Sequence, residues 1–548
     1  MSKKPTRFSN KNRTERLNTA KGAQYDLIII GGGITGAGIA LDASLRGLKV
    51  LLVEKYDFAS GTSSKSTKLI HGGLRYLKQL EFGLVRETGL ERAVAHNNAP
   101  HLVHPEDMLL PIVQKGTFSA LTAGLAITVY DWLANVQSED RKRMLSDEEV
   151  QGLEPLLNKD ILKSGILYSE YRTDDARLTI EIIKAAVRNG AEAFNYLEVA
   201  GFTYTKKGKL SGVICRDNLS QANIEIKSKT IVNAAGPWVD KIRQVDNEET
   251  ETNIQMSKGV HIVIDRDKLN LNSSVYFDVF DGRMTFAIPR GKVVYVGTTD
   301  TFYHDDPDRL VCTKEDAEYL IAAVNKMFEI PDLTTNDIKS TWTGLRPLIR
   351  KKGQGPSELS RKDEIYTSDS GLITIAGGKL TGFRKMAERV IDLVIEKQKR
   401  KKVECITEDY KIHHESFNNY EEFEFLIKTI DSYYSKMKTV DLENIVSAFG
   451  KDALPLIEEA QGDEEKLVKA QIDYTIEYEA ACKPIDFIER RLGWLYFDMD
   501  MAEKYVETVV KHFAKVFAHD SHWIEQNLKE CKEIMAVNSL KDLKQSVA

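Results

Sequence analysis

Cysteine is scarce in this sequence, and positive charge is not in excess. The 548 residues include five cysteines, which lie far apart: Cys215, Cys312, Cys405, Cys482 and Cys531. Because no two of them form a C-x-x-C pair, the sequence favours neither a zinc site nor a disulfide framework, and a reducing cytoplasmic setting fits best. The formal net charge of −6 at pH 7 argues against a general electrostatic affinity for nucleic acid.

Long hydrophobic runs are also missing. The first 22 residues are polar and basic and contain no apolar segment of the signal-peptide type. The stretch nearest to a transmembrane helix, 118–134, is 17 residues long and contains Asp131, so we expect a buried helix, with a monotopic membrane contact left open. For residues 1–22 we favour a solvated extension over a basic strip that contacts anionic lipid or another subunit.

The sequence does contain a complete βαβ unit of the dinucleotide-binding type. An apolar run over 25–30 leads into a G-x-G-x-x-G turn, and a second apolar run over 50–53 ends in Glu54. In this pattern Gly31 permits the tight turn, Gly33 lets the backbone approach a pyrophosphate, and Gly36 lets helix and strand pack closely. The helix N-terminus offers N–H groups to phosphates, and Glu54 can accept hydrogen bonds from ribose hydroxyls. The pattern alone does not distinguish FAD from NAD.

Two more strands end in glycines further along the chain. The apolar run 230–234 ends at Ala235-Gly236, and the run 372–376 ends at Gly377-Gly378. Together with the first unit, these strands predict one nucleotide-binding domain that strand-rich insertions interrupt, and the insertions would build a substrate lobe. Beyond a basic run at 399–402, the pattern of residues 405–548 is almost entirely helical, which predicts a separate C-terminal helical domain.

The remaining patterns give a coarse set of elements. Apolar periodicity predicts helices over 178–190, 314–328 and 381–397. Short β-rich runs predict strands near 197–203, 210–216, 222–227, 260–264, 284–288 and 293–296, whereas 101–170 favours a mixed, loop-rich region. The expected division is a basic N-terminal extension at 1–24, a central part at 25–398 with its substrate lobe roughly at 100–165 and 255–345, and the helical domain at 399–548.

Six short motifs then follow one another in a specific order. They are GTSSKSTKLIHGGLRY at 61–76, NAAGPW at 233–238, KGVH at 258–261, GTTD at 297–300, GLRPL at 344–348 and AGGKLT at 376–381. In this order they closely resemble the FAD-dependent glycerol-3-phosphate dehydrogenases, which belong to the wider flavoprotein group that includes D-amino-acid oxidase and glycine oxidase. The resemblance covers about residues 25–395 and continues more weakly into the helical tail.

The resemblance implies a fold, a cofactor and a reaction. The fold is α/β (α+β): an FAD-binding Rossmann-like domain of the D-amino-acid-oxidase/glutathione-reductase-2 type, an interleaved antiparallel-sheet substrate domain and a C-terminal all-helical domain. The reaction is oxidation of sn-glycerol 3-phosphate to dihydroxyacetone phosphate by hydride transfer to flavin N5, with electrons passed to a membrane quinone. Such enzymes are typically peripheral on the cytoplasmic face of the cell membrane. The sequence leaves open whether the chain forms a homo-oligomer.

The resemblance also names cofactor-binding positions. They are Gly31, Gly33, Thr35, Gly36, Glu54, Thr62, Ser63, Ser64, Lys68, Leu69, Ile70, Val199, Ala235, Gly236, Gly378, Lys379, Leu380 and Thr381. Residues 62–64 would bond the pyrophosphate or ribityl chain, residues 68–70 would lie along the flavin, and Val199 would contact the adenine through its backbone. Lys379, at a helix start, would stabilise negative charge near flavin N1 and O2.

Hydride removal from a secondary alcohol needs an acceptor, a base and an anchor for the substrate. The anionic phosphate calls for cations, and Arg75, Tyr76 and Arg346 match family substrate positions. Arg361 matches another, in a segment that is harder to align. Lys379 is a further candidate substrate ligand.

His261 is the best candidate for the base. Alternation along 260–264 puts Val260, Ile262 and Ile264 on one strand face, so His261 points the other way, together with Val263. An ordinary imidazole pKa of about 6.5 suits proton removal near neutral pH. The pattern leaves open whether His261 or Arg346 accepts the proton.

Other functions remain as alternatives. A glycerol-3-phosphate oxidase that reduces O₂ to hydrogen peroxide would share these motifs, although family oxidases often carry a long insertion where this chain has only 349–371. A non-catalytic flavin-binding protein and a relative of the amino-acid oxidases are also considered, but the cationic residues fit a phosphate substrate better. No metal site is expected, because His413-His414 has no companion carboxylate pattern and favours a solvated loop.

Overall fold

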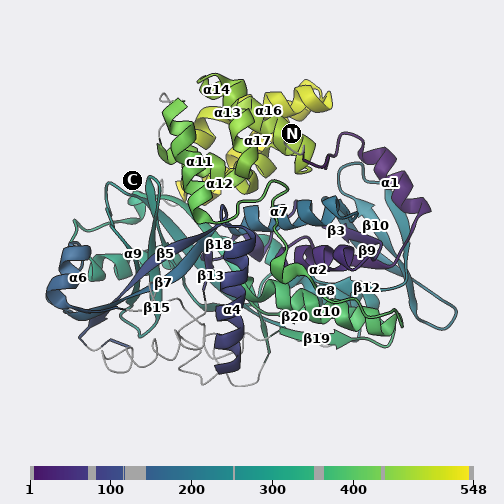
Figure 1. The fold of residues 1–548 in the computed structure, drawn as a ribbon, viewed down its shortest axis with the longest axis horizontal. Helices are drawn as coiled ribbons and strands as arrows, with labels where there is room; N and C mark the ends of the chain where they lie inside the picture. The colour runs from purple at the N-terminus through teal and green to yellow at the C-terminus, as the bar shows by residue number, and fades with distance from the viewer. Residues whose placement is uncertain are drawn as a thin grey trace.

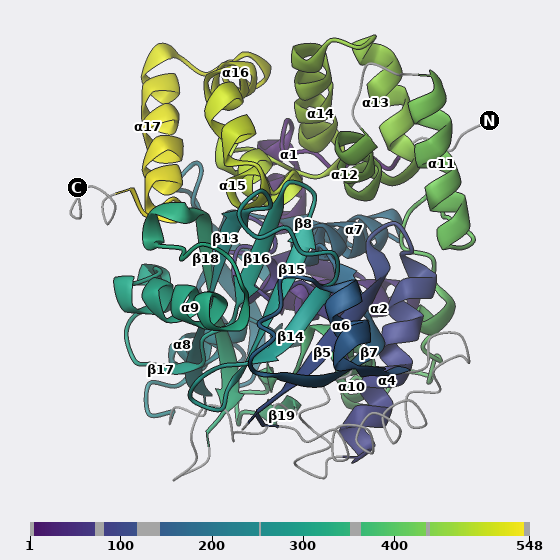
Figure 2. The same ribbon diagram turned by 90° about the vertical axis from the view of Figure 1, so that its left-hand side faces the viewer.

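The computed structural model describes residues 5–71, 82–114, 116–117, 143–250, 254–350, 363–433 and 439–541. The α/β fold is confirmed, with two large sheets, a smaller sheet and helices that pack on them. Figures 1 and 2 show the C-terminal helices gathered at one end of the molecule, above the sheets.

A six-stranded sheet forms the centre of the βαβ domain. Its order is β19 (Asp363–Thr367), β20 (Ile373–Gly377), β12 (Ile231–Asn233), β2 (Leu27–Ile30), β3 (Val50–Val53) and β8 (Glu192–Phe194). All neighbours pair in parallel except β19 with β20. Both faces are buried, which explains the continuous apolar runs in the sequence.

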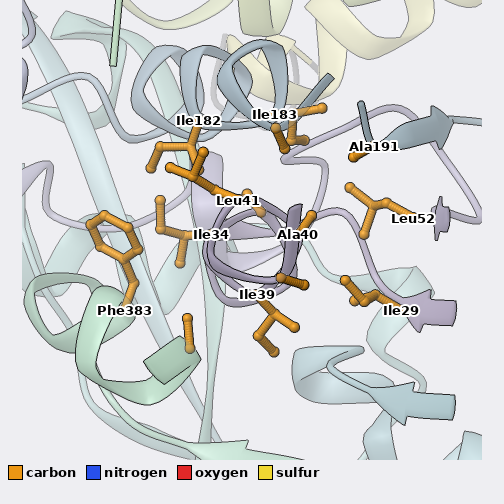
Figure 3. Close-up of a cluster of buried hydrophobic side chains, with 14 of the residues drawn as sticks. Ile29, Ile34, Ile39, Ala40, Leu41, Leu52, Ile182, Ile183, Ala191 and Phe383 are labelled. Carbon is orange, nitrogen blue, oxygen red and sulfur yellow. The ribbon is translucent and has the colours of Figure 1, made fainter. Parts of the chain in front are cut away.

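Three helices cover one face of this sheet: α2 (Ile34–Leu45), α7 (Asp175–Arg188) and α10 (Phe383–Lys397). Figure 3 shows α2 at the centre of this core, between Ile182 of α7, Phe383 of α10 and the strand residue Leu52. The other face carries the four-stranded sheet β1 (Gln24–Tyr25), β11 (Asn223–Ser228), β10 (Leu210–Asp217) and β9 (Leu197–Tyr204).

The larger sheet contains most of the residues for which a substrate lobe is expected, and we call it the substrate sheet, although its role stays a prediction. Its strands are β17 (Thr301–Tyr303), β13 (Ile254–Asp265), β16 (Val293–Gly297), β15 (Met284–Arg290), β14 (Ser274–Asp278), β5 (Val103–Val113), β7 (Leu162–Thr173) and β4 (Leu69–Ile70), with β18 (Ile338–Ile349) on β13 and β6 (Arg143–Ser146) on β7. Four further helices of these two domains are α4 (Phe82–Asn98), α6 (Asp147–Leu153), α8 (Val239–Asp246) and α9 (Lys314–Met327).

One expectation about this lobe is wrong. Residues 101–170 are not loop-rich where the structure describes them, because β5 and β7 form a long antiparallel pair from Val103↔Thr173 to Val113↔Leu162. Pro105 and the acidic pair that follows it interrupt the apolar alternation of β5, so the strand gives only a weak local signal. Cross-strand pairing decides the structure here.

The C-terminal residues are helical, as predicted. The helices are α11 (Tyr420–Tyr433), α12 (Thr439–Phe449), α13 (Ala453–Ala460), α14 (Glu464–Tyr478), α15 (Trp494–Phe497), α16 (Met499–Phe517) and α17 (Ser521–Asn538). Several of them share one hydrophobic cluster with the substrate sheet, where Trp342 of β18 lies with Ile472 and Tyr496. Among the described helices, none combines the length and apolar character that crossing a membrane requires.

The interpretation of residues 1–22 as a solvated extension is wrong for residues 5–22. Phe8 is buried, and its backbone exchanges hydrogen bonds of 2.9 and 2.8 Å with Glu477 and Ala480 of the helical domain. In α1 (Arg13–Gly22), the Arg13 guanidinium pairs with Asp217 at 2.8 Å. The segment therefore packs against two other parts of the chain, because its basic side chains find partners far away in sequence.

The closest backbone approach in the βαβ unit yields a stability prediction. A Cβ at Gly36 would lie 1.9 Å from the carbonyl oxygen of Gly31, whereas a Cβ at Gly83, also inside a helix, would meet nothing within 4 Å. Gly36→Ala should therefore destabilise the fold by about 1–3 kcal/mol, and Gly83→Ala should be neutral or slightly stabilising. Thermal and urea unfolding of both variants checks this; equal midpoints would show that α2 can move without cost.

Candidate functional site

A cavity of about 370 Å³ lies at the carboxyl ends of the parallel strands. The residues that follow β2, β12 and β20 all line it, so the three glycine-rich strand ends of the sequence meet at one place: Gly31, Gly33, Ala235, Gly236 and Gly378. Open α/β sheets bind ligands in this position, where strand ends and helix N-termini face the same space. The cavity also reaches the substrate sheet, since His261 and Arg346 line it.

The turn from β2 into α2 is shaped by backbone contacts. Gly31 has φ of +110°, and a Cβ there would lie 2.6 Å from the carbonyl oxygen of Ala234. Gly33 is the N-cap of α2, and it offers no side chain to cap the helix. The Oγ of Ser63 accepts a hydrogen bond from the N–H of Ile34 at 2.9 Å. The other first-turn N–H groups are the kind of donors that bind phosphate.

Glu54 is fixed at the end of β3. Its two carboxylate oxygens accept hydrogen bonds from the N–H groups of Gly32 at 2.6 Å and Tyr56 at 2.9 Å. Burial raises the pKa of Glu54 above its ordinary value, against the effect of these two donors. Val199 of β9 lines the cavity as well, so the acidic residue and the expected adenine contact face the same space.

Most predicted cofactor positions line the cavity, and four do not. Thr35, Glu54, Thr62, Ser63, Leu69, Val199 and residues 378–381 belong to the lining together with the glycines already named, whereas Gly36, Ser64, Lys68 and Ile70 do not. Lys68 is buried and its Nζ lies 2.6 Å from Asp175 Oδ1 and 2.9 Å from the carbonyl oxygen of Ser64. For these four residues a cofactor contact stays a prediction.

His261 lies where strand alternation placed it. On β13, Val260, Ile262 and Ile264 pack in one hydrophobic cluster, whereas Val263 packs in the cluster of Trp342 on the opposite face. The imidazole stacks on Trp342 with ring centroids 4.7 Å apart and 13° between the planes, and its Nε2 lies 3.0 Å from Thr67 Oγ1. Burial, then the charges of Arg346 and Lys68, lower the pKa of His261 well below its ordinary value.

Arg346 lies on the same sheet face as His261. The register pairs Ser257 with Arg346, Gly259 with Gly344, and His261 with Trp342, so these pairs are successive rows of one face. The guanidinium donates to Thr298 Oγ1 at 3.0 Å and to Asp300 Oδ1 at 3.3 Å.

Two glycines let neighbouring groups approach this sheet face closely. A Cβ at Gly259 would lie 2.5 Å from Arg346 Nη2, and one at Gly344 would lie 2.4 Å from the carbonyl oxygen of Lys65. Both glycines line the cavity between the rows of His261 and Arg346. A side chain at either position would therefore displace Arg346 or the backbone at Lys65 from the cavity wall.

Three predicted substrate residues, Arg75, Tyr76 and Arg361, lie outside the described residues. Lys379 follows Gly378 and lines the cavity. Sequence reasoning gave no role to Thr67 and did not consider Trp342, although both contact His261. Thr67 lies within the motif 61–76, but only the cross-strand register of β13 and β18 could have identified Trp342.

The interpretation of His413-His414 as a solvated loop is also wrong. The side chains of His413 and His414 are only 1% and 6% exposed, and both Nε2 atoms face the carboxylate of Asp452. The companion carboxylate exists, but it lies 38 residues further along the chain (452 − 414), so no local pattern could reveal it.

Comparisons with known proteins agree with this geometry. The family model described as FAD dependent oxidoreductase matches residues 26–384, and the one described as C-terminal domain of alpha-glycerophosphate oxidase matches residues 423–523. The chain belongs to the family of FAD dependent oxidoreductases, and its cofactor is FAD.

Individual relatives indicate which group of FAD dependent oxidoreductases this chain is similar to. The chain is similar to the aerobic glycerol-3-phosphate dehydrogenase of Staphylococcus haemolyticus, with 45% identity over 95% of this chain and 96% of the relative. It is 46% identical to that of Bacillus subtilis, over 94% and 95%. A solved structure of the Bacillus halodurans glycerol-3-phosphate dehydrogenase complexed with FAD shares 38% identity, covers 97% of this chain and 98% of that chain, and has a TM-score of 0.83. The resemblance seen in the sequence is confirmed.

The residues around the cavity fit FAD. The first-turn N–H groups of α2 that Ser63 does not occupy offer donors to a pyrophosphate, and the carboxylate of Glu54 lies where such βαβ units recognise a ribose. At Gly31 only a residue without Cβ leaves the turn intact. These residues would hold the dinucleotide, while Ala235, Gly236 and Gly378 would present backbone to it.

The buried pair of Lys68 and Asp175 yields a second stability prediction. Lys68→Met leaves the Asp175 carboxylate buried without its partner, so we expect a loss of about 3–5 kcal/mol of folding free energy. Lys529→Met, at a side chain that is 77% exposed, should change stability by less than about 0.5 kcal/mol. Thermal unfolding of both variants is the measurement. A Lys68→Met protein as stable as the control would mean that the pair does not support the cavity wall.

Proposed function

We propose that this chain oxidises sn-glycerol 3-phosphate to dihydroxyacetone phosphate and passes the electrons to a membrane quinone. The observation that carries the proposal is one cavity lined by the dinucleotide-binding turn and by the face with His261 and Arg346. The near full-length similarity to aerobic glycerol-3-phosphate dehydrogenases supports this substrate.

Residues of the chain would bind the substrate and remove its proton, while the cofactor accepts the hydride. FAD, when bound, supplies the acceptor for the hydride of the substrate carbon. Arg346 would bind the anionic substrate through its planar guanidinium, which Thr298 and Asp300 hold in position. His261 would take the hydroxyl proton, because its lowered pKa leaves the imidazole neutral at pH 7.

Substrate binding would strengthen His261 as a base. The Arg346 charge is one cause of the lowered pKa of His261, and a phosphate beside that guanidinium would offset the charge. The pKa of His261 would then rise toward the pH at which the enzyme works. Thr67, 3.0 Å from Nε2, would hold the ring in one orientation during proton transfer.

Further substrate contacts are proposed from the resemblance. Arg75, Tyr76, Arg361 and Lys379 match family positions near the substrate, and their cationic and phenolic groups suit a phosphate ester. We also propose that the protein works at the cytoplasmic face of the membrane as a peripheral protein. The runner-up for the reaction is an oxidase with O₂ as acceptor, since one matching family model is described from an oxidase.

The reaction is tested by anaerobic addition of sn-glycerol 3-phosphate to the FAD-loaded protein. We expect loss of the oxidised-flavin absorbance, with slow recovery in air and fast recovery with a soluble quinone. Fast recovery in air with peroxide release would favour the oxidase. No loss of absorbance, from a protein whose flavin dithionite still reduces, would contradict the proposed substrate.

The role of His261 is tested by His261→Gln, which keeps a polar side chain of similar size. We expect kcat to fall by about 10²–10⁴-fold with FAD content unchanged. Because the pKa of His261 is lowered, kcat/KM of the wild type should stay constant as the pH is lowered past 6.5 and should decline only at a lower pH. The variant should lack this decline at acid pH. An unchanged pH profile in the variant would assign the decline to another group.

A further inference from the structure

Three potential metal ligands meet outside the cofactor cavity. His413 and His414 lie in the segment between α10 and α11, and Asp452 ends the 3-10 turn Gly450–Asp452 before α13. His413 Nε2 is 3.5 Å from Asp452 Oδ2, and His414 Nε2 is 3.4 Å from Oδ1. The three ligand atoms all lie within 4.8 Å of one another. None of the three residues lines the cofactor cavity.

The spacing differs from that of an ordinary hydrogen-bonded pair. Among the described residues, neither Nε2 atom has a hydrogen-bond partner, although both histidines are buried beside a carboxylate. Buried polar atoms are rarely left without a partner. A tetrahedral ion with bonds of about 2.0–2.1 Å holds its ligands about 3.3–3.4 Å apart. Each imidazole is at about that distance from one carboxylate oxygen, His413 from Oδ2 at 3.5 Å and His414 from Oδ1 at 3.4 Å, so a small rotation of the carboxylate would bring one oxygen into a shared site.

At Nδ1, His413 faces both an acceptor and a donor of Glu415, and one of the two arrangements leaves a lone pair at Nε2. The Nδ1 atom of His413 lies 3.1 Å from the carbonyl oxygen of Glu415 and 3.2 Å from its amide nitrogen. If Nδ1 donates to the carbonyl, Nε2 carries the lone pair, which is the usual arrangement of a metal-bound histidine. Gly450 allows the His413 ring to pack closely against the chain, because a Cβ there would lie 2.7 Å from His413 Nε2.

Tyr474 and a cluster of buried charges lie next to Asp452. Tyr474 donates a 2.5 Å hydrogen bond to Asp452 Oδ2, which orients the carboxylate as an outer ligand of a metal site would. The nearby Lys184 already pairs with Glu181 and Glu479, and Arg177 pairs with the same two carboxylates. Arg491 Nε also lies 3.6 Å from Glu479 Oε2, and the charge of Lys184 acts on Asp452 as well.

We propose that His413, His414 and Asp452 bind one divalent transition-metal ion of the zinc class, with a water or another small ligand in the fourth position. Two imidazole nitrogens and a carboxylate oxygen are a donor set that Zn²⁺ accepts. The ion would fasten the segment after α10 to the start of α13. Its role would be structural, since the site is separate from the cofactor cavity.

The test uses the full-length, FAD-loaded protein after treatment with a chelator and measures Zn²⁺ binding by titration calorimetry and metal analysis. We expect one Zn²⁺ per chain for the wild type. Asp452→Asn and His414→Gln should each weaken binding by at least about 100-fold. The matched control is His512→Gln, because His512 forms an exposed 2.8 Å pair with Asp473 in the same domain. This control should bind Zn²⁺ like the wild type.

A thermal measurement guards against misfolded variants. Because the ion would bind only the folded chain, Zn²⁺ should raise the Tm of the wild type and of His512→Gln, and a chelator should reverse the rise. His414→Gln, which alters the more exposed histidine of the pair, should show no such rise. No tight Zn²⁺ site in the wild type, or equal binding by His414→Gln and the control, would overturn the proposal and leave a cluster of hydrogen-bonding groups only.

Discussion

The contact between α2 and the turn at Gly31 is the constraint on which the cofactor site depends. Because Gly36 has no side chain, α2 can approach the Gly31 carbonyl closely. The N-terminus of the helix therefore lies directly at the carboxyl ends of β2 and β12. The packing of α7 and α10 around α2 then holds the helix in place (Figure 3). Backbone N–H groups, the Glu54 carboxylate and three glycine-rich strand ends consequently line one cavity.

The sheet face that carries His261 and Arg346 is supported by the helical domain as well as by its own sheet. His261 stacks on Trp342, and Trp342 in turn packs against Tyr496 and Phe497 of α15. Lys68 lies near the same aromatic rings and is held by Asp175. The C-terminal helices therefore support the position of the proposed base, although none of their described residues lines the cavity. The helical domain thus contributes to the geometry of the site through these aromatic contacts.

Local sequence patterns predict much of the fold and of the site, whereas features that depend on partners distant in sequence could not be predicted. Periodicity over a few residues predicts the βαβ unit and the helical C-terminus. It also predicts that His261 points to the opposite strand face from Val260 and Ile262. Phe8, Arg13 and His413 were misjudged, since each is buried by partners that lie far away in sequence. Lys68 is likewise buried by a distant partner, Asp175. Burial of a polar side chain cannot be predicted before its partner is known.

The central claim is that the cavity brings the substrate C–H bond to the cofactor beside His261. Anaerobic rapid mixing with sn-glycerol 3-phosphate, unlabelled and deuterated at carbon 2, measures this step directly. Flavin reduction that is slower with the deuterated substrate, with one dihydroxyacetone phosphate formed per flavin reduced, is the predicted result. Failure of either substrate to reduce a flavin that dithionite reduces would contradict the claim.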